Sequence, residues 1–331
     1  MQLDISARGV IGPLYKAARA KEGRALTVAA VDLLIKSIKP GDKVIIATGW
    51  VDQPVIAPDC GESDGPPGAV ALARALRIGL KASPVILTDE CLVSGIKQVA
   101  RSAGFQCVPP DHLVHSIEQD KLLTMAVLPF PAGERGSQAA AAAVLDELQP
   151  TVCIAIERGG MNRAGVIHNM QGCDTGSSQA KLDYIFLNAR KRGIALLAIG
   201  DGGNEIGMAN IAAAVRAHVP YGEVCNCPCG AGLVPATPVD VLLTATVSNW
   251  GAYAVASLLA LVTGDIHAAN TGEQEARTLA VTAEAGFHDT ISGSVTPGAD
   301  GCSAQTHIAI VNLMHEVVEK GLKANSACRR K

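Results

Sequence analysis

The sequence predicts an α/β fold with a mainly parallel sheet and helices on both faces. Six short runs rich in β-branched and aliphatic residues recur along the chain, separated by segments long enough for helices. Hydrophobic residues make up 48% of the chain but aromatic residues only 3%. The core must therefore consist mostly of Ala, Val, Leu and Ile, which suits parallel strands buried on both faces.

The expected strands and helices alternate along the chain. Strands are expected at 43–48, 84–88, 124–128, 151–156, 194–199 and 241–246. Helices are expected at 67–81, 136–148, 178–192 and 206–218, with two more around a C-terminal loop at 287–301. This alternation predicts crossover units, which build a parallel sheet.

We expect a single large α/β domain over residues 1–331 with a C-terminal helical elaboration. A length of 331 residues would allow two domains, but large α/β sheets often exceed the ordinary domain size as single units. The loop at 221–238 is the best candidate for a seam between subdomains.

Composition and charge exclude several classes of partner. The 28 Lys and Arg against 31 Asp and Glu leave no basic excess with which to bind nucleic acid. The most apolar stretches, such as 252–262, are too short to span a membrane. No secretory signal is evident, so the ten cysteines are expected to be reduced thiols of a cytoplasmic protein. A homo-oligomer is compatible with the sequence.

Three cysteines, Cys225, Cys227 and Cys229, cluster within five residues. Alternating cysteines can bind zinc, but structural sites usually pair C-x₂₋₄-C motifs with a distant second pair, which is missing here. His218 lies nearby. We favour a turn with incidental thiols, and zinc binding stays open as the alternative.

Polar and glycine-rich segments follow four of the expected strands. They are 61–68 (GESDGPPG), 157–174 (beginning ERGG), 200–207 (GDGGNEIG) and 248–251 (SNWG). Ligands bind at the carboxyl ends of parallel strands, so these segments are expected to form one small-molecule site.

The segment at 200–207 first suggests a dinucleotide site, because Gly-x-Gly follows a strand. The full G-x-G-x-x-G pattern fails, since Glu205 occupies the third glycine position. A carboxylate there would repel a pyrophosphate, so no nicotinamide cofactor is expected. Asn204 or Glu205 could cap the next helix, but a cap does not explain Asp201 among three glycines.

Carboxylates in these segments could hold a divalent cation. Glu62 and Asp64 lie two residues apart and would share one face of an extended chain. Together with Asp201 and Glu205 they offer the hard oxygen ligands that Mg²⁺ or Mn²⁺ prefers. The alternative is a solvated acidic turn, since Ser-Asp-Gly-Pro is ordinary turn sequence.

Other side chains suit an acidic small-molecule substrate. Arg158 and Arg163 can form bidentate hydrogen bonds with a carboxylate, although Glu157 could instead form an ion pair with Arg158. His168 is a candidate substrate ligand or base, with a structural role as the alternative.

The helix predicted after the last strand begins with Ser248 and Asn249. Either side chain could cap that helix. Free backbone amides at a helix start can also bind a carboxylate, so both residues, together with Asn204, are candidate substrate ligands.

These motifs together resemble the D-glutamate cyclase family, a domain formerly of unknown function. The resemblance extends to Asp300-Gly301 and His307, and its most specific part is 199–210 (IGDGGNEIGMAN). The sequence departs from the family pattern at positions that include Gln171, where arginine is usual. Losing that charge could alter which anion the site holds.

The resemblance implies a stand-alone cyclase domain, a hydro-lyase that dehydrates D-glutamate to 5-oxo-D-proline. A divalent cation would act as Lewis acid, and Arg158 or Arg163 would hold the α-carboxylate. Asp201, Glu205 and Glu157 would transfer protons. The alternatives from other classes are a non-catalytic binder of a metal or acidic metabolite, and a metal-dependent phosphate-ester hydrolase.

Overall fold

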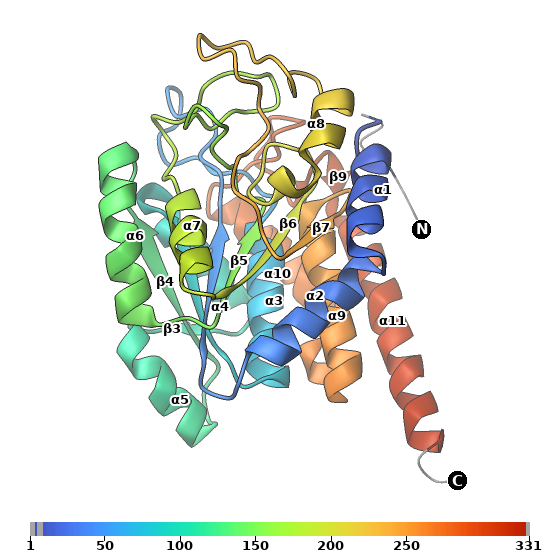
Figure 1. Cartoon of the computed structure of the whole chain (residues 1–331). Coiled ribbons are helices and arrows are strands. Elements are labelled where there is room, and N and C mark those ends of the chain that lie inside the picture. The colour runs from blue at the N-terminus through green and yellow to red at the C-terminus, as the bar shows by residue number, and fades with distance from the viewer. Residues whose placement is uncertain (1–3, 5–8, 329–331) are drawn as a thin grey trace.

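The computed structural model describes residue 4 and residues 9–328 of the chain. It confirms the predicted fold class, because seven parallel strands form one sheet in the order β3-β4-β2-β1-β5-β6-β7, with helices on both faces (Figure 1). The strands are β1 Lys43–Thr48, β2 Ser83–Asp89, β3 Gln106–Cys107, β4 Thr124–Phe130, β5 Val152–Ile156, β6 Ala195–Gly200 and β7 Val241–Thr244. All six predicted strands are present, and in this sheet only the short edge strand β3 was missed.

Helices connect the strands and cover the sheet. Those of the described chain are α1 Ile11–Glu22, α2 Leu26–Ser37, α3 Pro66–Gly79, α4 Val93–Ser102, α5 Leu113–Gln119, α6 Glu134–Leu148, α7 Asp183–Lys191, α8 Ala212–His218, α9 Ser248–Thr263, α10 Gly272–Glu284 and α11 Ala304–Cys328. Helices α7 and α8 begin later than predicted, because residues 178–182 lie in a loop and Met208–Ile211 form a 3-10 helix before α8. The predicted C-terminal loop contains a small hairpin of β8 Gly298–Ala299 and β9 Cys302–Ser303.

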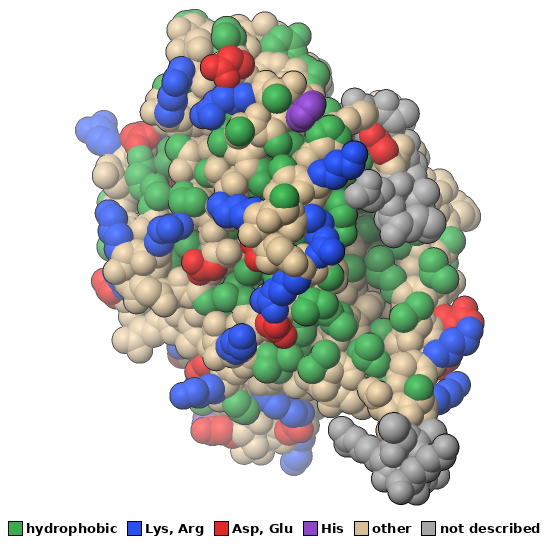
Figure 2. Space-filling model, turned by 45° about the vertical axis from the view of Figure 1, so that its right-hand side comes forward, with side chains coloured by type: hydrophobic (Ala, Val, Ile, Leu, Met, Phe, Trp, Pro, Cys, Tyr) green, Lys and Arg blue, Asp and Glu red, His purple; other side chains and the backbone are tan. Residues whose placement is uncertain are grey.

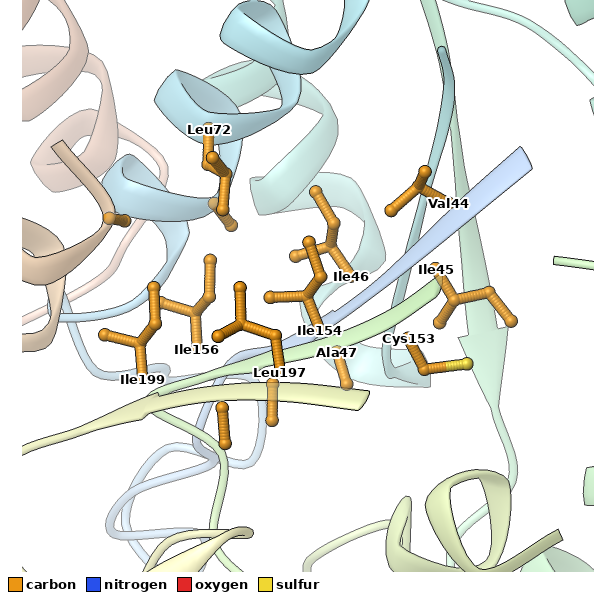
Figure 3. Close-up of a cluster of buried hydrophobic side chains, with 14 of the residues drawn as sticks. Val44, Ile45, Ile46, Ala47, Leu72, Cys153, Ile154, Ile156, Leu197 and Ile199 are labelled. Atoms are coloured by element: carbon orange, nitrogen blue, oxygen red, sulfur yellow. The ribbon is translucent and has the colours of Figure 1, made fainter. Parts of the chain in front are cut away.

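The core lies on both faces of the central strands, as their aliphatic composition predicts. Strand β1 pairs in parallel with β2 on one side and β5 on the other. In Figure 3, Ile46, Ile154 and Ile156 point toward Leu72 of α3. Ile45 alternates to the opposite face and is equally buried. Burial of both faces explains why these strands are continuous hydrophobic runs.

The strand order places a topological switch point beside β1. The chain moves from β1 through α3 to β2 on one side, and later returns through α6 to β5 on the other side. Right-handed crossovers in opposite directions place α3 and α6 on opposite faces of the sheet, as Figure 1 shows. Open α/β sheets bind ligands outside the carboxyl ends of the strands at such a point.

The expected seam at 221–238 connects α8 with β7 of the same sheet. It is tied to the loop after β5, because Ala236 N–H donates to the Met161 carbonyl and Asn162 Nδ2 donates to the Gly232 carbonyl. Within the described part of the chain, no helix combines the length and apolar character that crossing a membrane requires.

Candidate functional site

A cavity of about 340 Å³ opens at the carboxyl edge of the sheet, at the switch point. The loops after β1, β5 and β6 contribute to it, together with the loop before α11. Its lining residues are Trp50, Asp52, Gln53, Glu62, Glu157, Asn169, Met170, Gln171, Cys173, Asp201, Asn204, Thr290, Ile291 and Asp300. Five of these described lining residues are carboxylates, and none is Lys or Arg.

Asp201 lies where two groups of carboxylates meet. One of its oxygens lies within 4.8 Å of carboxylate oxygens of Asp64 and Asp300, and the same holds for Asp201 with Glu157 and Glu205. The Asp201 side chain is only 8% exposed, and its Oδ2 atom has no hydrogen-bond partner among the described residues. Asp201 is therefore shared by both groups, with an oxygen available to a ligand.

Glu157 follows β5 directly and reaches the cavity through an unusual backbone conformation. Its φ angle of 45° is in the left-handed region, which is costly for a residue with a side chain and is found most often at functional sites. The Ser248 hydroxyl donates a hydrogen bond to Glu157 Oε2 at 2.5 Å. Ser248, which was predicted to bind substrate, thus orients the carboxylate of Glu157 instead.

Asp64 and Asn249 cap each other's helices across the site. Asp64 accepts backbone N–H groups of Ser248 and Asn249 at the start of α9, at 2.8 and 2.9 Å. In return, Asn249 Oδ1 accepts N–H groups of Gly65 and Gly68 at the start of α3, at 3.0 and 2.7 Å. A substrate carboxylate was expected at the backbone amides that begin α9. The carboxylate found there is that of Asp64, and the helix dipole favours this negative charge.

Glu205 holds the shape of the loop around Asp201. Its carboxylate accepts backbone N–H groups of Asp201, Gly202 and Gly203 at 2.6–2.8 Å. The φ angle of 110° at Gly203 allows the chain to turn these donors inward. These are the N–H groups that would otherwise bind a phosphate, and a carboxylate of the protein already occupies them.

Burial and mutual repulsion favour the protonated forms of these carboxyl groups. Burial, followed by the neighbouring Asp300, raises the pKa of Asp201 and of Glu62 well above the usual range. Burial and the neighbouring Glu205 raise the pKa of Glu157 in the same direction. A carboxyl group with a raised pKa is a stronger base when ionised, which favours its use in general acid–base catalysis.

The two arginines predicted to bind substrate lie elsewhere. The guanidinium of Arg158 is 1% exposed and forms an ion pair with Asp89 at the end of β2, with further hydrogen bonds to the carbonyls of Gly49 and Ala180. Glu157 lines the cavity, whereas the Arg158 side chain is directed away from it, to Asp89 and the two carbonyls. Arg163 is exposed and does not line the cavity.

His168 also lies outside the cavity lining, although the neighbouring residues 169–171 contribute to it. Its ring is fully buried against the Cys225–Cys229 segment, and its Nε2 atom lies 3.2 Å from the Cys227 sulfur. The expected turn thus gathers its sulfurs around His168 rather than His218. Asn204 lines the cavity and donates to the His168 carbonyl at 2.8 Å.

Asp300 and Asp52 are cavity carboxylates that the site prediction missed. Asp300 is part of a motif shared with the D-glutamate cyclase family. It is far along the chain from the strand ends, so the sequence did not show that it reaches the cavity. In the structure Asp300 has a positive φ angle of 54°. Asp52 lines the rim and contacts His288 Nε2 at 3.0 Å.

The donor set fits a divalent cation. Asp64, Asp201 and Asp300 converge within 4.8 Å and offer only oxygen, which suits Mg²⁺ or Mn²⁺. The unpartnered Oδ2 of Asp201 gives such an ion a free ligand atom. Glu62 lies beside this group but accepts a hydrogen bond from Thr290 at 2.7 Å.

Comparison with known proteins places the chain in a family. The sequence model of the family described as "D-glutamate cyclase-like, C-terminal" matches residues 1–315. The human protein named "D-glutamate cyclase, mitochondrial" is 33% identical over 230 residues, which cover 67% of this chain and 33% of the human protein. The match thus spans about a third of that relative's own length. The chain belongs to the D-glutamate cyclase-like family.

Proposed function

We propose that the chain is a lyase that cyclises D-glutamate to 5-oxo-D-proline in the acidic cavity, with a divalent cation bound there. The observation that carries this proposal is the lining: five carboxylates and, among the described lining residues, no Lys or Arg. Such a cavity attracts the ammonium group of an amino acid. Where its carboxyl groups are ionised, they repel the carboxylates of the same substrate, and a bound cation would offset that repulsion.

Two kinds of proton transfer are needed for this reaction. The ammonium group must lose two protons to become the amide nitrogen, and the departing γ-carboxylate oxygen must gain two to leave as water. Carboxyl groups with raised pKa values can carry out both transfers. We assign them to Glu157, oriented by Ser248, and to Asp201.

The remaining polar groups of the cavity would bind the cation and orient the substrate. A divalent cation, when bound, would polarise the γ-carboxylate and stabilise the charge that develops on it. Asp64 and Asp300 would hold the cation together with Asp201. Neutral amides at the wall, such as Asn204 and Gln171, can donate hydrogen bonds to the α-carboxylate in place of an arginine.

The surface and the cysteines are consistent with a small-molecule enzyme of a reducing compartment. On the face shown in Figure 2, Lys and Arg side chains are scattered rather than gathered into a single groove. The nine cysteines whose side chains the structure describes form no disulfide, as expected in the cytoplasm. We propose the cytoplasm on this ground, while the human relative's name refers to mitochondria.

Incubation of the pure protein with D-glutamate, followed by NMR, tests the proposal. The α-proton signal of glutamate should be replaced by that of 5-oxoproline when Mg²⁺ or Mn²⁺ is present, and EDTA should stop the reaction. L-Glutamate is the matched control for chirality, and Asp59→Asn, an exposed carboxylate outside the cavity lining, is the control variant.

The alternative functions give other outcomes. Thermal stabilisation by D-glutamate and a metal without turnover would identify a binder. Release of phosphate from simple phosphate esters would identify a hydrolase. Either result would overturn the cyclase assignment.

A further inference from the structure

Four potential metal ligands converge outside the acidic cavity. They are His168, from the loop after β5, and Cys225, Cys227 and Cys229, from the loop after α8. Their ligand atoms all lie within 4.8 Å of one another. None of the four lines the acidic cavity, and the proposed reaction uses none of them.

We propose that these four side chains form a structural zinc site. Zinc in structural sites is tetrahedral and commonly bound by three cysteines and one histidine. Sulfur and imidazole are also the softer ligands that favour zinc over Mg²⁺ or Mn²⁺. With four protein ligands the coordination is closed, so the ion would stabilise structure rather than bind substrate.

The distances match such a site. Two sulfurs that each lie about 2.3 Å from a tetrahedral zinc ion are about 3.7 Å apart. Here the Cys225 sulfur lies 3.6 Å from that of Cys227 and 3.3 Å from that of Cys229. The Nε2 atom of His168 lies 3.2 Å from the Cys227 sulfur and 3.6 Å from that of Cys229. A disulfide would require sulfurs about 2.05 Å apart.

The environment of the ligands supports the same assignment. His168 is fully buried, and the sulfurs are the only hydrogen-bonding partners of its ring among the described residues. Asn162 Nδ2 lies 3.5 Å from the Cys229 sulfur, as a donor to a metal-bound thiolate would. Thiols are weak hydrogen-bonding partners for a buried imidazole. A zinc ion would replace these weak contacts with four metal–ligand bonds, one to each side chain.

The site would fix one wall of the acidic cavity. Residues 169–171, directly after the ligand His168, line that cavity. The segment between Cys225 and Cys227 also holds this wall, because Asn226 N–H donates to the Gly172 carbonyl at 2.9 Å and Asn226 Nδ2 to the Gln171 carbonyl at 2.8 Å. Zinc would join the two loops at this point without contributing a ligand to the cavity.

Metal analysis of the full chain, purified without chelators, tests the site directly. We expect about one zinc ion per chain in the wild type and in Cys91→Ser, which replaces an exposed cysteine of the 3-10 helix between β2 and α4. Cys227→Ser should contain less than a tenth of that amount. Asp201→Asn should retain its zinc, which distinguishes this site from the acidic cavity and makes the result independent of the proposed reaction.

Two measurements on the wild type keep the test decisive if Cys227→Ser does not fold. Replacement of zinc by Co²⁺ should produce the absorption of a tetrahedral thiolate site, and a mercurial reagent that binds thiols should release the metal. After release, hydrogen exchange of residues 168–174 should become faster. Wild-type protein that takes up no zinc, or that contains a Cys225–Cys229 disulfide by peptide mass mapping, would overturn the proposal, as would full zinc content in Cys227→Ser.

Discussion

Replacing Asp201 with asparagine separates the charge of this side chain from its part in the shape of the loop. Asparagine preserves the size and the turn preference but removes the negative charge. Since Asp201 belongs to both carboxylate groups of the cavity, the substitution should weaken cation binding and remove one proton carrier. We expect turnover of D-glutamate to fall by about 10²- to 10⁴-fold, the usual contribution of a positioned acid–base group.

The same substitution should stabilise the protein when no cation is present. Two negative charges at the 4.8 Å limit of these carboxylate groups repel each other by about 3.5 kcal/mol at an effective dielectric constant of about 20, and closer charges repel more. The wild type avoids part of this repulsion by binding protons, because the pKa of Asp201 is raised by burial and by Asp300. The expected gain in the free energy of unfolding is therefore smaller, on the order of 1 kcal/mol.

Urea unfolding at neutral pH, with EDTA and with Mn²⁺, measures both effects. Mn²⁺ at about 100 times its dissociation constant should stabilise the wild type by about 2.7 kcal/mol, and most of this gain should be lost in Asp201→Asn. Asp59→Asn should behave like the wild type throughout. Turnover of Asp201→Asn within about twofold of the wild type, with the same response to Mn²⁺, would refute the assignment of Asp201.

Three further predictions test the other structural assignments. Arg158→Met should lower the free energy of unfolding by about 3–5 kcal/mol, because it leaves Asp89 buried without its ion-pair partner. Arg163→Ala should change neither stability nor KM. A folded Arg158→Met whose only defect is a raised KM would instead support a role of Arg158 in substrate binding. Asn249→Ala should cost about 1–2 kcal/mol in urea unfolding because it removes the acceptor for two N–H groups at the start of α3, and an unchanged midpoint would contradict that cap. Burial raises the pKa of Glu275 to about 7, so its stabilising contribution is present at low pH and is lost as pH rises through about 7. Relative to Glu275→Gln, the wild type should lose about 2 kcal/mol of stability between about pH 5.5 and pH 8, and parallel pH profiles in urea would exclude this titration.

Local patterns in the sequence were sufficient for the sheet and for the location of the site. A strand buried on both faces must be a hydrophobic run, and its boundaries follow from composition alone, as in β1 and β5. The end of such a strand in a parallel sheet lies at the ligand-binding edge, so Glu157 and Asp201 could be placed there from their positions after β5 and β6. The starts of α7 and α8 were missed, because contacts with distant parts of the chain, such as Ala180 N–H with Asp89 and Gly207 N–H with the Thr237 carbonyl, hold the preceding segments in other conformations.

Only the tertiary structure decided which side chains meet. The direction of Arg158 depends on the backbone conformation just after β5 and on Asp89, which comes from another strand. Asp300 approaches Asp201 only because the loop before α11 folds back over the sheet. His168 and Cys227 are likewise brought together by two separate loops. Sequence periodicity indicates which residues share one face of a helix or strand. Contacts between residues of different elements depend on strand order and on the paths of the loops, and no local sequence pattern predicts these.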